Sequence, residues 1–159
     1  MSDLTNNKQI QELLDRESIR DLAIKYAHHI WQGDIDGWVN LYAEDGAITS
    51  DHPDRPASRG HAQLRELAEA VVRDSRPRPF VHNHVIDLIG PYDATGTCYT
   101  EVHLSIEGER GLVVGLYHDR YVKIDNQWKF KERKSDIEYF GLESEYQVPE
   151  SKNKKHFGK

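Results

Sequence analysis

The first half of the chain carries apolar residues at the spacing of helices. Over residues 10–31 they recur every three or four positions between charged side chains, which predicts a long amphipathic helix with a break point near residues 17–18. Gly33 is expected to end this helix, and a short second helix is expected over residues 37–42. The same spacing returns over residues 61–73 and predicts a third helix.

From Phe80 onward the pattern changes to the two-residue period of strands. Before this point, a short strand is expected over residues 47–49 and a polar loop over residues 51–58. After it come four longer strands bounded by turn residues, 80–88, 94–106, 112–124 and 127–135. Helices followed by such strands predict an α+β fold in which a curved antiparallel sheet wraps the N-terminal helices. We expect residues 1–150 to form this single domain and residues 151–159 to be a disordered polar tail.

Two histidines lie on the strand predicted over residues 80–88. Strict alternation places His82 and His84 on the face of Ile86 and Leu88, so both imidazoles are expected to point into an apolar interior. A histidine there either is a hydrogen-bonded core residue or moves protons, because its pKa lies near neutrality. This strand is therefore the first candidate for chemistry.

The last predicted hairpin brings acidic and aromatic side chains together. A two-residue turn at Asp125 and Asn126 places the following residues on one face: Tyr117, Asp119, Tyr121, Trp128, Phe130 and Glu132. Two carboxylates are thus expected to share an aromatic face. Asp119 can orient an imidazole there, or it can form a structural ion pair with Arg133 or Arg120.

Composition narrows the classes of function. The net charge of -6, with bases scattered among acids, argues against nucleic-acid binding, and no apolar run is long enough to span a membrane. The polar start indicates a cytoplasmic protein, and the single cysteine, Cys98, excludes an internal disulfide. No metal and no cofactor are expected, because the pair His82 and His84 has no third ligand at a suitable spacing and no phosphate-binding loop is present.

Several segments together resemble the SnoaL-like proteins of the nuclear transport factor 2-like (NTF2-like) superfamily. They are residues 19–27, the turn 38–46, Arg59-Gly60, the strand around 83–86, residues 94–96, and 117–119 leading to Trp128. The resemblance spans about residues 10–140 and implies a cone-shaped fold around an apolar pocket. The same fold serves dehydratases, dehydrochlorinases, isomerases, cyclases and subunits without catalysis.

The resemblance also implies a site. In its dehydratase-like members an acid late in the first helix orients a histidine on the strand after the third helix, and a tyrosine assists the leaving oxygen. Tyr26 matches the tyrosine, whereas Trp31 stands at the position of the acid. The usual histidine falls near Arg78 or Pro79, so His82 lies a few residues further along the strand.

The sequence thus leads to the hypothesis of a cofactor-independent lyase or isomerase acting on a small apolar, cyclic substrate with a hydroxyl or carbonyl group. His82 would shuttle the proton, Tyr26 would bind the substrate oxygen, and Asp119 would orient the histidine. The expected pocket wall is Trp31, Phe80, His84, Tyr117, Tyr121 and Trp128. The alternative is a non-catalytic protein that binds a small ligand or a partner chain, and a homodimer or homotrimer is expected from apolar residues on the outer face of the sheet.

Overall fold

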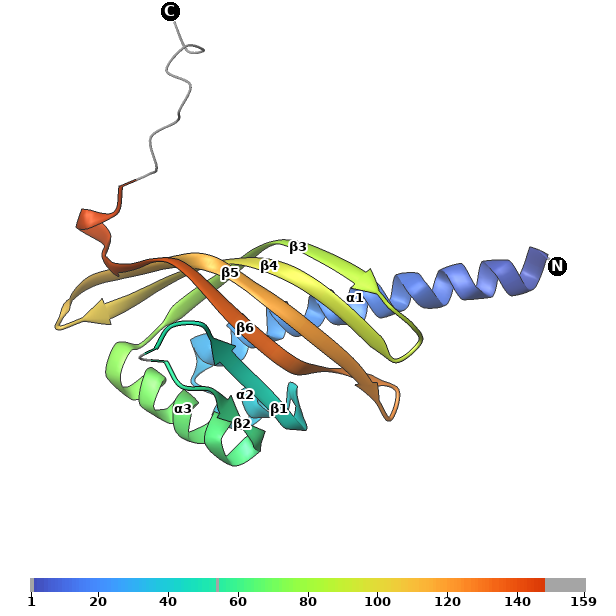
Figure 1. Cartoon of the computed structure of the whole chain (residues 1–159), viewed down its shortest axis with the longest axis horizontal. Helices are drawn as coiled ribbons and strands as arrows, with labels where there is room; N and C mark the ends of the chain where they lie inside the picture. The colour runs from blue at the N-terminus through green and yellow to red at the C-terminus, as the bar shows by residue number, and fades with distance from the viewer. Residues whose placement is uncertain (1, 54, 148–159) are drawn as a thin grey trace, which may run out of the picture.

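A six-stranded curved sheet forms the body of the molecule, and the helices lie on its concave side in the computed structural model (Figure 1). The structure describes residues 2–53 and 55–147. The strands are β1 (Tyr42–Ser50), β2 (Ser58–Arg59), β3 (Arg78–Leu88), β4 (Asp93–Ile106), β5 (Glu109–Ile124) and β6 (Gln127–Leu142). Their order across the sheet is β2-β1-β6-β5-β4-β3.

The pairing of the strands confirms the α+β fold class and corrects one detail of it. β3 to β6 form an antiparallel meander, and the predicted pairing of Tyr121 with Phe130 is present. β1, however, pairs with β6 in parallel, so the sheet is mixed. The parallel pair arises because the chain passes through β2 and α3 before the meander begins, which brings β6 back beside β1 in the same direction.

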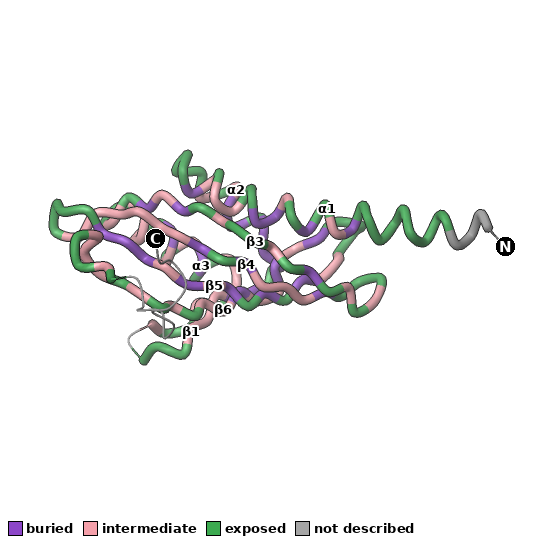
Figure 2. The backbone as a smooth tube through the Cα atoms, turned by 90° about the horizontal axis from the view of Figure 1, so that it is seen from above, coloured by how far each residue is buried: buried purple, intermediate pink, exposed green. Residues whose placement is uncertain are grey.

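The helices are α1 (Ser2–Gln32), α2 (Ile35–Val39) and α3 (Gly60–Ser75), and a single 3-10 turn, Glu143–Glu145, follows β6. The predicted break in α1 is absent: the helix continues through Glu17 and Ser18, and the Ser18 hydroxyl donates to the carbonyl of Leu14 within it. α2 begins earlier than predicted, since the carboxylate of Asp34 accepts from the backbone N–H of Gly37 and caps it. The first half of α1 extends beyond the sheet into solvent (Figures 1 and 2).

The hydrophobic core fills the space between the concave face of the sheet and the helices. It contains Ile19 and Leu22 of α1, Leu64 of α3 and, from the sheet, Tyr42 and Phe130, all buried. Asp15, near the middle of α1, joins the helix to the sheet, because its carboxylate accepts from Lys123 Nζ at 2.8 Å and from Trp128 Nε1 at 2.9 Å. These contacts fix α1 along the sheet and leave the other end of the cone to the cavity described below.

A β-bulge in β3 overturns the strict alternation assumed for the histidine strand. The register against β4 shifts between His82 and Val85, and Asn83 adopts a positive φ of 46°. The extra residue reverses the parity, so His84 and Ile86 face the interior while His82 is exposed on the convex face. The prediction that both histidines point inward is therefore wrong for His82.

A second bulge reverses the parity of β6. Arg120 pairs with Glu132 and Tyr121 pairs with Phe130, so Lys131 is the extra residue. Beyond it Arg133 turns inward, whereas Glu132 turns outward, where its carboxylate accepts from Thr49. The prediction that two carboxylates share the aromatic face is wrong, because the bulge places Arg133 on that face and Glu132 on the opposite one.

No helix within residues 2–53 and 55–147 is long and apolar enough to cross a membrane. Within the same residues no three acidic, histidine or cysteine side chains gather in a way that could hold a metal ion.

Candidate binding site: an apolar cavity with an arginine at its base

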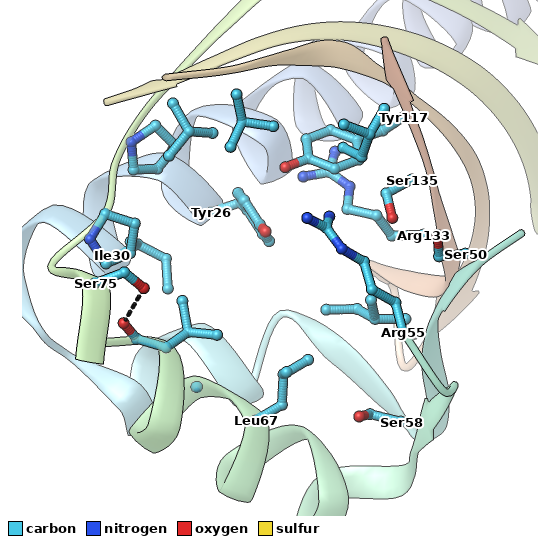
Figure 3. A pocket seen from close by; sticks show the side chains of 18 of the residues that line it. Tyr26, Ile30, Ser50, Arg55, Ser58, Leu67, Ser75, Tyr117, Arg133 and Ser135 are labelled. Atoms are coloured by element: carbon cyan, nitrogen blue, oxygen red, sulfur yellow. Dashed lines mark hydrogen bonds between the residues drawn. The ribbon is translucent and has the colours of Figure 1, made fainter. Parts of the chain in front are cut away.

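A cavity of about 480 Å³ lies between the concave face of the sheet, α1 and α3 (Figure 3). Its apolar wall comes from all three layers: Ile30 and Trp38 from the first two helices, Leu67, Ala68 and Val71 from α3, and Val102, Leu104, Val113 and Ile137 from the sheet. The polar groups are few: Tyr26, Tyr117, Arg133, Arg55, Thr49 and four serines, Ser50, Ser58, Ser75 and Ser135. This size and balance are typical of pockets that bind one small molecule.

Arg133 lies at the base of the cavity in a cage of aromatic rings. Its Cζ atom is 4.3 Å from the ring centroid of Tyr26, 4.2 Å from that of Tyr117 and 4.3 Å from that of Phe130. Its Nε and Nη2 atoms donate to the two carboxylate oxygens of Asp119 at 2.8 and 2.7 Å. Burial lowers the pKa of Arg133 and the Asp119 carboxylate raises it, and the carboxylate prevails, so the guanidinium stays charged.

Asp119 is bound on both oxygens, which continues the network away from the cavity. Tyr121 donates its hydroxyl to Asp119 Oδ2 at 2.8 Å, and His84 Nε2 lies 2.8 Å from the same hydroxyl oxygen. Because the Tyr121 proton is directed to Asp119, His84 must donate from Nε2, which assigns its neutral tautomer. Burial lowers the pKa of His84, partly offset by Asp119, and is consistent with this neutral state.

One donor of the network has no partner. Arg133 is 0% exposed, and within the described residues its buried Nη1 atom makes no hydrogen bond. A buried donor without an acceptor costs about 1–3 kcal/mol or more when charged, and the indole Nε1 of Trp38, another residue of the cavity lining, is likewise buried without a partner.

Two tyrosines add hydroxyl groups next to this arginine. Figure 3 shows the Tyr26 hydroxyl directed into the cavity, with Tyr117 beside Arg133. Burial, reinforced by the neighbouring Tyr117 and Tyr42, raises the pKa of Tyr26 well above its usual value despite the nearby guanidinium. Tyr26 is therefore a neutral hydroxyl at physiological pH, able to donate to a ligand oxygen.

Of the three residues predicted to be catalytic, only Tyr26 lines the cavity. His82 lies on the convex face and is exposed, and it lines no part of the cavity. Asp119 is buried behind Arg133 and has both oxygens bound by Arg133 and Tyr121, so it acts on the cavity only through the arginine. Of the two roles expected for Asp119, orienting an imidazole or forming an ion pair, the structure shows the ion pair, with Arg133.

Of the six residues predicted to form the pocket wall, only Tyr117 lines the cavity. Tyr121 and Trp128 are buried in the core away from it. His84 faces inward but contacts Tyr121 rather than the cavity. Trp31 and Phe80 are 41% and 43% exposed and stack edge to face at the surface.

Trp31 and Pro79 meet where the resemblance implies the acid and the histidine. The indole Nε1 of Trp31 donates to the carbonyl oxygen of Pro79 at 2.8 Å, so these two positions are neighbours here as the layout requires. Neither side chain can accept a proton near neutral pH, since an indole nitrogen is only a donor and proline has no titratable group. Among the described residues that line the cavity there is no histidine and no carboxylate.

Sequence patterns missed Arg133 and Arg55 as cavity residues. Arg133 turns inward only because of the bulge at Lys131, which strand parity does not predict. Arg55 lies in the connection between β1 and β2, and nothing in the polar sequence of this loop distinguishes it from a solvent-exposed arginine.

An α+β cone around an apolar cavity defines the NTF2-like class of proteins. Residues 11–134 match the SnoaL-like domain family, and the chain belongs to this family. The position of the cavity on the concave side of the sheet is the one the resemblance implies.

Several solved structures share the fold of this chain. A protein of unknown function from Mycobacterium tuberculosis is 29% identical, with 79% of this chain and 73% of that chain covered and a TM-score of 0.71. A putative scytalone dehydratase from Novosphingobium aromaticivorans is 22% identical (88% and 93% covered, TM-score 0.77). The LinA-type3 hexachlorocyclohexane dehydrochlorinase from Novosphingobium barchaimii is 18% identical (89% and 99% covered, TM-score 0.76). No curated protein matches the chain in sequence.

Proposed function

We propose that this protein binds one small, largely apolar molecule in the cavity and does not carry out the proton transfer of the dehydratase-like members of its superfamily. The ligand would place an oxygen atom at the base of the cavity, beside Arg133 and Tyr26, and its apolar body against α3 and the sheet. The observation that carries the proposal is the unpartnered Nη1 of Arg133 at the base of a cavity whose described lining has neither a histidine nor a carboxylate.

The lack of a base supports binding over catalysis. Abstraction of a proton from carbon needs a group whose pKa lies near the working pH and which reaches the substrate. Trp31 stands at the implied position of the acid and Arg78 or Pro79 near that of the histidine, and Trp31 Nε1 donates to the Pro79 carbonyl oxygen. Arginine and tyrosine remain, and both donate hydrogen bonds to a ligand oxygen without taking up a proton.

Filling the cavity tests the proposal. Leu67 points into the cavity from α3 (Figure 3), so Leu67→Trp should occupy the space of a ligand ring. With 2-naphthol as a neutral probe, isothermal titration calorimetry is expected to show binding to the unchanged protein and at least about tenfold weaker binding to the variant, a loss of about 1.4 kcal/mol.

The matched control is Leu13→Trp, the same substitution at a position of α1 that is 66% exposed. This variant should bind the probe like the unchanged protein. If Leu67→Trp binds the probe as tightly as Leu13→Trp does, the cavity is not the binding site and the proposal is wrong.

The second candidate function is the cofactor-independent lyase or isomerase. It is favoured by family membership and by Tyr26, which lies in the cavity at the position the resemblance implies. An enzyme of this type would lose turnover in Tyr26→Phe while keeping most of its ligand affinity. Turnover of a cyclic hydroxy or keto substrate by the unchanged protein, abolished in Tyr26→Phe but not in His82→Gln, would favour this candidate over simple binding.

A further inference from the structure

The charge of the cavity is the feature that the proposed function leaves unexplained. Two guanidinium groups line it, those of Arg133 and Arg55, in a chain whose net charge is -6. Asp119 neutralises Arg133 through two hydrogen bonds. The charge of the second arginine therefore decides the electrostatic character of the cavity.

Arg55 has no acidic partner among the described residues. Its guanidinium lies over the ring of Phe140 of β6, whose centroid is 5.0 Å from the Arg55 Cζ atom. Figure 3 shows the side chain reaching from the β1–β2 connection toward the middle of the cavity. Other surface cations of this region are paired, as Lys134 is with Asp51 and Lys131 with Asp45.

An uncompensated cation against apolar walls attracts an anion more strongly than it would in water. The surrounding lining, including Val71, Val102 and Ile137, lowers the local dielectric constant and weakens the competition from solvent. Arginine also offers two parallel N–H donors, which match the two oxygens of a carboxylate. The aromatic ring of Phe140 restricts the Arg55 side chain and so reduces the entropy lost on pairing.

We infer that the natural ligand is a small aromatic or alicyclic carboxylate, whose carboxylate group pairs with Arg55 and whose ring system lies in the apolar cavity above Arg133 and Tyr26. This inference rests on the proposed function, since it requires the cavity to be the binding site. The cavity would thus prefer carboxylates over neutral molecules of the same shape, and Arg55 would be the residue that causes this preference. Arg133 and Tyr26 then serve an oxygen substituent at the other end of the ligand.

Two probes of the same shape separate charge from fit: 2-naphthoate, which is an anion at pH 7.5, and 2-naphthamide, which is neutral. Calorimetry on the full chain at low salt is expected to give at least about tenfold tighter binding of 2-naphthoate, a difference of about 1.4 kcal/mol. Arg55→Met, which keeps most of the length of the side chain, should abolish this preference and leave the affinity for 2-naphthamide within about twofold. Arg55→Lys should retain part of the preference, because it keeps the charge and loses the paired donors.

The matched control is Arg110→Met, which removes the same charge from an exposed arginine that pairs with Glu143 outside the cavity lining. It should leave the preference for 2-naphthoate unchanged. Because Arg55 is half-exposed in a loop, its variants are expected to fold, and circular dichroism and a thermal melt check this directly.

Three results overturn the inference. If the unchanged protein binds both probes equally, the cavity does not select anions, although the proposed function stands. If Arg55→Met weakens both probes alike, the arginine is part of the wall and not the determinant of charge selection. If neither probe binds the unchanged protein and Leu67→Trp changes nothing for 2-naphthol, the proposed function fails, and the carboxylate preference fails with it.

Discussion

At the scale of single residues, the buried pair of Asp119 and Arg133 dominates the site. Both side chains are 0% exposed, and the pair is joined by two hydrogen bonds. Burying two charges is costly, and the pair is tolerated because its geometry is bidentate and Tyr121 satisfies a further acceptor position. The pair holds Arg133 in the aromatic cage with one donor left for the cavity, so its role is to position a binding group.

Removing the acid alone should therefore be strongly destabilising. Asp119→Asn keeps the shape and leaves the buried guanidinium uncompensated, which is expected to lower the free energy of unfolding by about 3–5 kcal/mol in urea denaturation. Asp136→Asn, at an exposed carboxylate 3.7 Å from His118, should change it by less than about 0.5 kcal/mol. Similar losses in the two variants would contradict the assignment of Asp119 as the counter-charge of Arg133.

His84 gives the protein a predictable response to mild acid. Burial lowers its pKa in the folded state below the usual 6.5, so the unfolded chain binds a proton that the folded protein does not. The contribution to stability is therefore fully present above about pH 6.5 and is lost as the pH falls through the folded pKa. Urea denaturation between pH 7 and pH 5 should show this fall in the unchanged protein.

The variant His84→Gln should show a flatter pH dependence in that window, because glutamine can still donate to Tyr121 and does not titrate. The exposed His118→Gln serves as the comparison and should keep the slope of the unchanged protein. Among the described residues, three acids have pKa values below the usual 3.8, Asp15, Asp34 and Asp45, and all three therefore titrate outside this window. An unchanged slope in His84→Gln would show that another group causes the loss of stability.

At the scale of secondary-structure elements, bulges in the strands decide which side chains face the cavity. The bulge at Asn83 turns His82 outward and His84 inward, and the bulge at Lys131 turns Arg133 inward. Each adds one residue to its strand and exchanges the two faces beyond that point, and a further bulge at Glu138 of β6 exchanges them again, so that Ile137 and Phe140 both line the cavity. The site therefore depends on local backbone irregularity as much as on the identity of the residues.

The bulge in β3 should be sensitive to the residue that carries it. Asn83 has a φ of 46°, a left-handed conformation that asparagine and glycine tolerate and a β-branched residue does not. Asn83→Val is expected to lower the free energy of unfolding by about 1–3 kcal/mol, and Asn83→Gly to change it by about 0.5 kcal/mol or less, both in urea denaturation.

The control for this pair is Asn40→Val, at an exposed asparagine with an ordinary φ of -65°, which should cost less than Asn83→Val. Equal losses at the two positions would mean that the positive φ does not constrain position 83.

At the scale of the whole molecule, the buried cysteine of β4 reports on global opening. Cys98 is 0% exposed on β4, and burial raises the pKa of its thiol to about 11. The thiol is therefore protonated at pH 8 and out of contact with solvent, and both effects slow its reaction with a thiol reagent. Its labelling requires the sheet and helices to separate.

We expect labelling of Cys98 by a chromogenic disulfide at pH 8 to be at least about a hundredfold slower than that of a free cysteine. In urea the rate should rise over the same concentration range as the unfolding transition followed by circular dichroism. A ligand that binds the cavity should slow it further, since binding to the folded state alone stabilises by about 2.7 kcal/mol at a concentration of 100 times its dissociation constant. Fast labelling without urea would indicate local opening of β4.

The sequence by itself determined the elements and the fold class. The periods of the apolar positions identified α1, α3 and the four strands of the meander, because these periods follow from the geometry of a helix or strand with one buried face. The segments shared with SnoaL-like proteins identified the family, and two of the predicted site residues, Tyr26 and Tyr117, line the cavity. A homodimer or homotrimer remains a prediction.

Only the tertiary structure decided which polar groups the cavity receives. Strict alternation assigned His82 and Glu132 to the interior, because a sequence does not reveal where a strand gains an extra residue. Pairing with neighbouring strands creates the bulges, and those neighbours are distant in sequence. The same holds for Arg55, which faces the cavity only because the β1–β2 connection and α3 lie beside the concave face of the sheet. Hydrophobic periods are local, whereas the position of a side chain relative to a shared cavity depends on contacts between distant segments.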